Sequence, residues 1–169
     1  DKKNNIFYNY AVKTKTIANN NVHGLLCIGD NLWVSTFFNG VDIFNTNRKS
    51  TEKHIDRNIE KNGLQSSFIN FLFQAKNGSI YATTKGVYKY NPKIENFVIE
   101  NNLPTGIIYT SIFEDSNNNL WIGTYRDGLF LYNPKNGKNK HFLREDKSIN
   151  NLPHNSVNYI YEDSNQTIW

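Results

Sequence analysis

Apolar and polar residues alternate in short runs along the whole chain, and Gly, Asn or Asp follows most of these runs. The run at residues 107–114, for example, is rich in β-branched and aromatic residues and ends at the polar cluster of residues 115–119. A period of two that is interrupted by turn residues predicts β-strands joined by tight turns. No segment keeps an apolar period of 3.6 residues, so we expect an all-β chain without helices.

One group of these runs recurs along the chain. The segment Leu-Trp-Ile-Gly-Thr at residues 120–124 is followed by Gly-Leu-Phe-Leu-Tyr-Asn-Pro at 128–134, and similar pairs begin at residues 32 and 80. Aromatic residues stand at the same place in successive copies, namely Trp33, Tyr81, Trp121 and Trp169. Copies of about 40 to 50 residues that contain only short strands are typical of the blades of a β-propeller.

Each full copy is interpreted as a four-stranded antiparallel blade, with strands A, B, C and D in chain order. Strand A is expected at residues 22–28, 68–73, 107–114 and 157–161, and the crossings between blades at 62–64, 102–104 and 151–153. Residues 1–169 then form a single β-propeller fragment. Its parts are a half-blade at 1–20 with strands C and D, blades at 21–61, 62–100 and 101–146, and a half-blade at 147–169 with strand A and the start of strand B.

The two half-blades leave two arrangements open. Strands C and D near the N-terminus could pair with strands A and B near the C-terminus and close a fourth blade, which would remove exposed sheet edges. The chain reaches strand B of the last copy only at Trp169, so an incomplete arc of a larger propeller is favoured. Exposed edges at both ends of such an arc predict self-association, with a homodimer as one expected form.

Composition narrows the function classes. The 169 residues are 38% hydrophobic, and no apolar run approaches the roughly 18 residues of a membrane helix. The chain has neither an initiator Met nor a signal peptide, so we expect a mature or excised sequence. Its net charge of +4 comes from Lys and Arg residues scattered over turns and outer strands, which argues against a nucleic-acid partner. Cys27 lies among apolar residues and is expected to be a buried thiol.

Together, these motifs resemble the two-component regulator propeller repeat. The shared pattern is Asn-Leu-Pro, alternating apolar residues, Glu-Asp, Leu-Trp-Ile-Gly-Thr, Gly-Leu and Tyr-Asn-Pro at residues 102–134, and it begins again at 151–169. The resemblance implies the periplasmic sensor domain of a bacterial hybrid two-component system histidine kinase/response regulator, many of which respond to oligosaccharides. The parent protein would be anchored in the membrane and would carry kinase, receiver and DNA-binding modules that regulate transcription through a phosphorelay. The sensor segment itself would not be catalytic.

Departures from the repeat concern its architectural positions. The first full copy lacks the acidic turn and has Ser35 where the repeat has Gly. Between strands A and B, the repeat has Gly three residues after Asp. Gly78 fits this position, and Asn118 can replace Gly because Asn tolerates positive φ, whereas Gln166 does so less easily. We therefore expect the turn of the last copy to be strained or differently shaped.

Several residue groups could suggest catalysis or metal binding. Asp115, Asn117 and Asn119 alternate as in a calcium loop, but the Gly that should follow is absent, so a hydrogen-bonded hairpin turn is favoured. The carboxylates at 114–115 and 162–163 are adjacent, and neighbours on a strand point to opposite faces, which is a poor arrangement for an acid/base pair. The four His residues show no ligand spacing. We expect no catalytic residue, no metal site and no cofactor.

Candidate binding residues lie in the connections between strands B and C. In a propeller with strand A innermost, the B to C and D to A connections emerge on one face, and such loops usually carry function. Aromatic rings beside polar groups suit sugars, because rings stack on C–H faces while hydroxyl groups form hydrogen bonds. Lys and Arg on this face favour an acidic or sulfated glycan. The candidate residues are Phe37, Phe38, Asn39, Lys85, Tyr125, Arg126 and Asp127.

The working hypothesis is a non-catalytic, oligosaccharide-sensing propeller segment of a periplasmic sensor. Two alternatives stay open. A propeller-fold carbohydrate-active enzyme, such as a lyase, would need convergent titratable groups. A protein-binding scaffold of the WD-repeat kind would need recurring Gly-His and Trp-Asp pairs, whereas the sequence has Trp-Ile-Gly-Thr. Phe37 and Phe38 could also simply pack on neighbouring loops.

Overall fold

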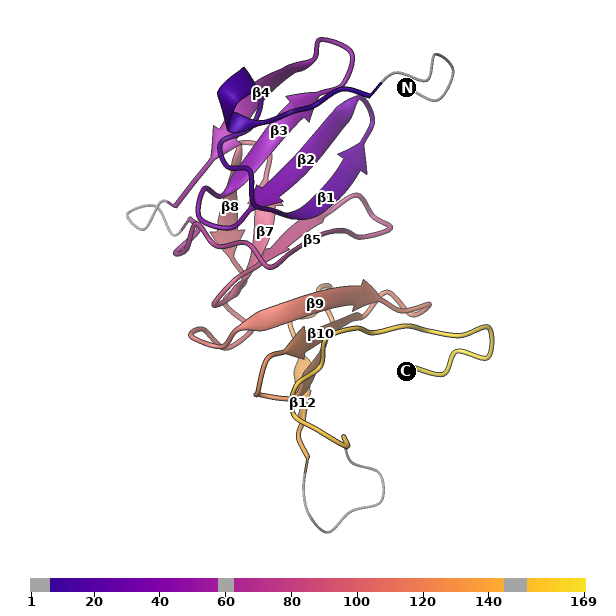
Figure 1. Ribbon diagram of the computed structural model, residues 1–169. Coiled ribbons are helices and arrows are strands. Elements are labelled where there is room, and N and C mark those ends of the chain that lie inside the picture. Colours follow the sequence, from indigo (N-terminus) through magenta and orange to yellow (C-terminus); the bar gives the residue numbers. More distant parts are fainter. Residues whose placement is uncertain (1–6, 58–62, 145–151) are drawn as a thin grey trace.

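The computed structural model describes residues 7–57, 63–144 and 152–169, which form three β-sheets that follow one another along the molecule (Figure 1). Blade 1 consists of β1 (Val22–Ile28), β2 (Asn31–Thr36), β3 (Val41–Asn45) and β4 (Ser50–Ile55); blade 2 of β5 (Phe71–Gln74), β6 (Ile80–Thr83), β7 (Val87–Asn91) and β8 (Asn96–Ile99); and blade 3 of β9 (Tyr109–Glu114), β10 (Leu120–Thr124), β11 (Leu129–Tyr132) and β12 (Asn139–Phe142). Each sheet is an antiparallel meander. The predicted all-β arc of four-stranded blades is confirmed.

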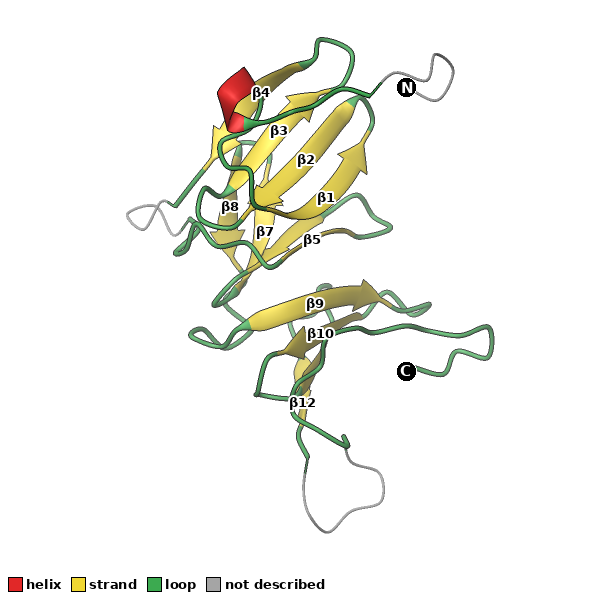
Figure 2. Cartoon of the chain, viewed as in Figure 1, coloured by secondary structure: helices red, strands yellow, loops and turns green. Residues whose placement is uncertain are grey.

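The predicted absence of helix holds except for one short element. Residues Val12–Thr14 form the 3-10 helix η1, which is the helix that Figure 2 shows near β4. Strands C and D of the N-terminal half-blade were expected here, and this expectation was wrong for the described residues 7–20. Backbone N–H groups of this segment have hydrogen-bond partners outside any sheet, namely the Thr16 hydroxyl for Ala11 and the Asp42 carboxylate for Ala18.

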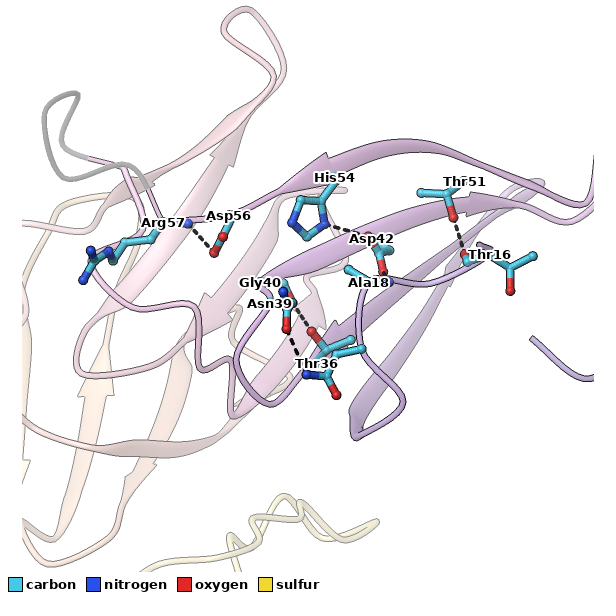
Figure 3. Close-up of polar contacts among 11 residues, drawn as sticks. Thr16, Ala18, Thr36, Asn39, Gly40, Asp42, Thr51, His54, Asp56 and Arg57 are labelled. Atoms are coloured by element: carbon cyan, nitrogen blue, oxygen red, sulfur yellow. Dashed lines mark hydrogen bonds and ion pairs between the residues drawn. The ribbon is translucent and has the colours of Figure 1, made fainter. Parts of the chain in front are cut away.

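Residues 7–20, which we call the strap, lie against blade 1 instead (Figure 3). The N–H of Ala18 donates to Oδ2 of the buried Asp42 over 2.6 Å, and Oδ1 of Asp42 lies 2.7 Å from Nδ1 of His54. The Thr51 hydroxyl donates to the carbonyl of Thr16, and the Tyr10 ring centroid is 4.6 Å from that of Phe44. The strap thus covers one face of the outer strands β3 and β4.

The strap does not cover strand β1. Cys27, predicted to be buried, is exposed, and neighbouring Leu25 is 61% exposed. Alternate residues of a strand face opposite sides, so Leu26 and Ile28 face blade 2 while Leu25 and Cys27 face away from it. Local apolar neighbours therefore predicted burial that the tertiary arrangement does not provide.

The C-terminal segment follows blade 3 without forming a full sheet. The N–H of Val157 donates to the carbonyl of Thr124 over 2.8 Å, and a single antiparallel bridge joins Glu162 to Ile168. Residues 157–161, predicted as strand A, form no assigned strand. Each sheet contains strands of one blade only, and residues 7–20 lie at blade 1 whereas the C-terminal segment follows blade 3 in Figure 1. The closed fourth blade is therefore not formed by the described residues.

Two apolar cores lie between the blades. The first core joins blade 1 to blade 2 and contains Trp33, Val41 and Ile43 from blade 1 and, among others, Ile69 from blade 2. The second core joins blade 2 to blade 3. Cross-strand partners share a sheet face, so Trp33 and Ile43, which pair, both face blade 2. By the same register, Tyr81 and Trp121 face the next blade. Trp33 and Tyr81 are buried, whereas Trp121 is half-buried because no complete blade covers it.

Blade 1 has Ser35 where the repeat has Gly, because the Gly and the Ser of one cross-strand pair have exchanged places. In blade 3, Gly123 pairs with Ser111, and a Cβ on Gly123 would lie 2.6 Å from the Ser111 hydroxyl oxygen. In blade 1 the order is reversed, because Ser35 pairs with Gly24, and a Cβ on Gly24 would lie 2.9 Å from the Ser35 hydroxyl oxygen. Each pair therefore has room for one Cβ only, and Ser35 fits because its partner is Gly.

The turns between strands A and B have a common shape in the second, third and last copies. Gly78, Asn118 and Gln166 all have positive φ, of 83°, 61° and 62°. The expected difference in shape was wrong, since the Gln166 N–H donates to the Asp163 carbonyl over 3.0 Å, as that of Asn118 does to Asp115 over 3.1 Å. The positive φ of Gln166 is the left-handed backbone in which strain was expected. In this last turn, Oδ1 of Asp163 accepts from the N–H groups of Asn165 and Thr167 over 2.8 and 3.0 Å.

An Asp–Trp hydrogen bond accompanies these turns. Trp121 Nε1–H donates to Oδ2 of Asp115, and Trp169 Nε1–H donates to Oδ2 of Asp163, each over 2.9 Å. The Trp169 bond and the N–H groups of Thr167 and Asn165 hold the pKa of Asp163 below its usual value. In the second copy, Ala75 stands in place of this Asp and Tyr81 stands in place of this Trp. Because Tyr81 has no indole N–H, it does not need the Asp carboxylate as an acceptor.

Candidate ligand-binding face

The three loops between strands B and C are built alike. In each, the N–H of a Thr at the end of strand B or directly after it donates across the loop to a Gly carbonyl, over 3.0, 2.9 and 3.1 Å. Gly40 and Gly128 have positive φ, and a Cβ on either would lie about 2 Å from a carbonyl oxygen of strand D. Both positions therefore require Gly. The three bonds are Thr36 to Gly40, Thr84 to Gly86 and Thr124 to Gly128.

Each loop also contacts the connection that enters the next blade. Gly40 N–H donates to the Ser67 carbonyl over 2.8 Å, and Gly128 N–H donates to the Asn155 carbonyl over 2.8 Å. In the middle loop, the Lys85 carbonyl accepts from Gly106 N–H over 2.7 Å. The B to C and D to A connections therefore lie together at one end of the blades, which we call the loop face.

The first loop carries an aromatic cluster. The ring centroid of Phe37 lies 4.2 Å from that of Phe38 and 4.4 Å from that of Phe68, and His23 is 5.0 Å from Phe37. Phe38 is nevertheless 64% exposed. Asn39 is held by its side chain, whose Oδ1 accepts from Asn19 Nδ2 over 2.8 Å. The rings thus pack on a neighbouring loop and still leave one face open to solvent.

The second loop is the shortest and contributes one exposed candidate, Lys85. No ring stacking or ion pair joins Lys85 to the other candidates among the described residues. The structure therefore separates the seven candidates into an aromatic group on the first loop, a lone lysine and a third group.

The third loop presents Tyr125, Arg126 and Asp127. The guanidinium carbon of Arg126 lies 4.9 Å from the centroid of the exposed Tyr125 ring, a cation–π arrangement. The Asp127 N–H donates to the Thr124 hydroxyl over 2.8 Å, which fixes the loop. Burial, with a smaller contribution from the Asp127 carboxylate, raises the pKa of the Tyr109 phenol above its usual value.

Tyr125 and Arg126 line a pocket of about 440 Å³ together with His154, Asn155 and Ser156; we call this the loop-face pocket. His154 Nδ1 accepts from the Ser156 N–H over 2.9 Å, so a neutral His154 carries its proton on Nε2 and can donate outward. The Ser156 hydroxyl donates to the Tyr125 carbonyl. These contacts tie the D to A connection to the third loop.

Sequence reasoning missed His154, Asn155 and Ser156. The crossing at 151–153 was identified, although Asn62 and Asn151 of two crossings lie outside the described residues. The missing step was to pair each D to A connection with the preceding B to C loop. Their shared end of the blade was the signal that could have found these residues.

Residues that suggested other chemistry have structural roles here. Asp115 Oδ1 accepts from the N–H groups of Asn117 and Asn119 over 2.9 and 2.8 Å, so the predicted hydrogen-bonded turn is present. Within residues 7–57, 63–144 and 152–169, no group of three His, Cys, Asp or Glu side chains is arranged to hold a metal ion. The same residues contain no helix long and apolar enough to cross a membrane.

Comparison with known proteins agrees with this architecture. The model of the two component regulator propeller family matches residues 102–126 and 151–169, which confirms the predicted resemblance in these two segments. No curated protein matches the sequence.

Solved structures share the fold at low sequence identity. The extracellular domain of the hybrid two component system BT4673 from B. thetaiotaomicron superimposes with a TM-score of 0.79 at 18% identity, over 95% of this chain and 21% of that one. That of BT3049 from the same organism gives 0.51 at 16% identity, over 91% and 32%. Virginiamycin B lyase from Staphylococcus aureus gives 0.61 at 13% identity, over 88% and 48%. The chain thus spans about a fifth of the BT4673 domain.

Proposed function

We propose that this chain is the ligand-sensing part of an extracytoplasmic propeller in a hybrid two-component histidine kinase, and that its loop-face pocket binds an oligosaccharide. The pocket formed by Tyr125, Arg126 and residues 154–156 is the observation that carries the proposal. The repeats of the matched family and the shared fold of two extracellular domains support the cellular context.

The pocket has the chemistry that a sugar requires. The exposed face of Tyr125 can stack on the C–H face of a pyranose, while Arg126 and His154 Nε2–H can donate to ring hydroxyl groups. A volume of about 440 Å³ falls in the range of small-molecule sites. Arg126 favours a glycan that carries a negative charge, in keeping with the net charge of +4.

Signalling would follow from a change in packing rather than from catalysis. A ligand that binds one arrangement of two sensor domains more tightly than another shifts the equilibrium toward that arrangement. A homodimer anchored in the inner membrane, with this propeller in the periplasm, provides such a pair. The kinase and output modules then lie elsewhere in the parent protein.

The test is calorimetric titration of the full-length sensor with a panel of neutral, carboxylated and sulfated oligosaccharides. Tyr125→Ala and Arg126→Ala should each weaken binding by roughly 1 to 3 kcal/mol, through loss of a stacking contact and of a charged hydrogen bond. Tyr159→Ala and Arg48→Ala are matched controls, because both residues are exposed and line no part of the pocket. They should leave the affinity unchanged.

An unchanged affinity in both pocket variants would remove the site from the loop face. The competing function is a lyase-like enzyme, which the fold shared with virginiamycin B lyase brings into consideration. His154, as the titratable imidazole of the pocket, would then be the base. Release of a cleaved product from any glycan of the panel, lost in His154→Ala, would favour the enzyme over the sensor.

A further inference from the structure

The faces through which successive blades meet are built from one residue of each strand. In blade 1, Trp33, Ile43 and Lys53 are cross-strand partners that face blade 2. The corresponding residues are Tyr81, Lys89 and Val98 in blade 2, and Trp121, Leu131 and Lys140 in blade 3. Blade 2 is therefore the one of the three with a charged residue at the central position, where the others have Ile or Leu.

The interface between blades 1 and 2 is closed. The Trp33 indole is 5% exposed and lies edge-on against Tyr90 and Phe97, with ring centroids 4.9 and 6.2 Å apart. At the rim, Lys53 Nζ lies 2.5 Å from Oε2 of Glu95 in the turn between β7 and β8. An aromatic residue, an aliphatic residue and an ion pair thus fill this interface from core to rim.

The interface between blades 2 and 3 differs at all three positions. Tyr81 replaces the larger indole, Lys89 replaces the aliphatic residue, and Val98 takes the place of Lys53. Across from them, Gly137 stands where blade 2 has Glu95, each with positive φ in its turn between strands C and D. Smaller and charged side chains at matched positions leave an open groove beside Lys89.

Three cavities of about 360, 300 and 350 Å³ adjoin Lys89, and together we call them the Lys89 groove. The Lys89 ammonium lies 5.8 Å from the Tyr81 ring centroid, and no carboxylate is in ion-pair distance of it among the described residues. The groove is lined besides Lys89 by Asn77, Asn118, Lys135, Tyr90 and Pro92.

Two carboxylates also line the groove, and both have partners. Glu114 is buried, and its Oε2 accepts from the Lys76 N–H over 2.5 Å. Glu100 Oε1 accepts from Asn102 Nδ2 over 3.3 Å. Neither is paired with Lys89 or Lys135, so the two ammonium groups offer their charge to whatever enters the groove.

We infer that the Lys89 groove is a binding site for a small ligand that carries a carboxylate. Lys89 holds the carboxylate by a charge-assisted hydrogen bond, and Lys135 adds a second cation from blade 3. The amides of Asn77 and Asn118 pair with further polar groups of the ligand, and Pro92 offers an apolar surface. A ligand seated there contacts two blades at once, independently of the loop-face pocket.

The probes are chosen to separate the sources of the carboxylate. The full-length protein is titrated calorimetrically with D-glucuronate, with D-glucose as the neutral sugar of the same ring size, and with succinate as a carboxylate without a sugar ring. Glucuronate should bind and glucose should not. Succinate that binds as tightly as glucuronate identifies the carboxylate alone as the recognised group, and weaker succinate identifies a sugar acid.

Lys89→Leu is the decisive variant, because Leu131 occupies the same position in blade 3. Glucuronate binding should weaken roughly 10- to 100-fold while the melting temperature stays the same or rises. The control Lys13→Ala removes a positive charge on η1, which is distant from Lys89 in the sequence. It should bind glucuronate as tightly as the unsubstituted protein does. Tyr125→Ala should also leave glucuronate binding in the groove unchanged, which separates this site from the proposed function. Equal binding of glucose and glucuronate, or full binding by Lys89→Leu, would overturn the inference.

Discussion

The paired positions Gly123–Ser111 and Gly24–Ser35 allow a sharp test of how the blades pack. A Cβ added to Gly123 would lie 2.6 Å from the Ser111 hydroxyl oxygen and 2.6 Å from the Val157 carbonyl oxygen, and 3.0 Å from a Val157 methyl group. One of these atoms belongs to the backbone of the segment that follows blade 3. Real Cβ atoms do not approach so closely, so strands must move, and we expect Gly123→Ala to cost about 3 kcal/mol.

Gly24→Ala is the milder counterpart. Its Cβ would meet the Ser35 hydroxyl oxygen at 2.9 Å, and the next atom, Leu72 N, lies at 4.0 Å. A hydroxyl group can rotate, so the expected cost is about 1 kcal/mol. Ser35→Gly in the same chain removes the contact and should recover most of that loss. Ser111→Gly should recover Gly123→Ala only in part, because the Val157 carbonyl stays in place.

Urea unfolding followed by Trp fluorescence measures all of these variants, and the coupling within each pair comes from a double-mutant cycle. The free energies of unfolding should decrease more for Gly123→Ala than for Gly24→Ala. A Gly123→Ala variant within 0.5 kcal/mol of the parent would refute the reasoning. So would a Gly24→Ala variant that Ser35→Gly does not restore.

Two further predictions concern the aromatic residues of the blade faces. Trp33→Ala should cost about 3 to 5 kcal/mol in denaturant unfolding and Trp121→Ala less, because Trp33 is 5% exposed whereas Trp121 is half-buried; equal costs would contradict the blade order. Burial raises the pKa of Tyr81 to about 12, so the folded state keeps a proton that the unfolded state releases near pH 10. Stability should then fall between about pH 10 and 12, by up to about 1.4 kcal/mol for each pH unit, and Tyr81→Phe should lessen this fall in thermal unfolding measured across that range. An identical alkaline profile for Tyr81→Phe would show that Tyr81 does not ionise on unfolding.

Local residue order was sufficient for the strands within each blade. The predicted strand at residues 22–28 matches β1, and that at 107–114 contains β9, because alternation and turn residues act over a few neighbouring positions. The repeat also indicated the open arc and the family resemblance. It failed at residues 7–17, where the same alternation is present but the described residues contact β3 and β4 through side chains instead of pairing as strands.

The candidate site could likewise be predicted in part from local sequence and in part not. Tyr125 and Arg126 could be assigned to a B to C loop, and so to one end of the blades, from the repeat alone. That they adjoin His154 and Ser156 depends on the next D to A connection, about 30 residues further on. That these residues bind a ligand stays a prediction, as does the dimer.

The sequence by itself determined the all-β class, the blade repeat and the positions of most strands, since these depend on contacts within a hairpin. The tertiary structure decided which residues face a neighbouring blade and which face solvent. Cys27 is exposed, Ser35 fits beside Gly24, and Lys89 borders a groove for the same reason. Each outcome depends on residues of another strand or blade, and packing between such distant segments cannot be predicted from a local sequence pattern.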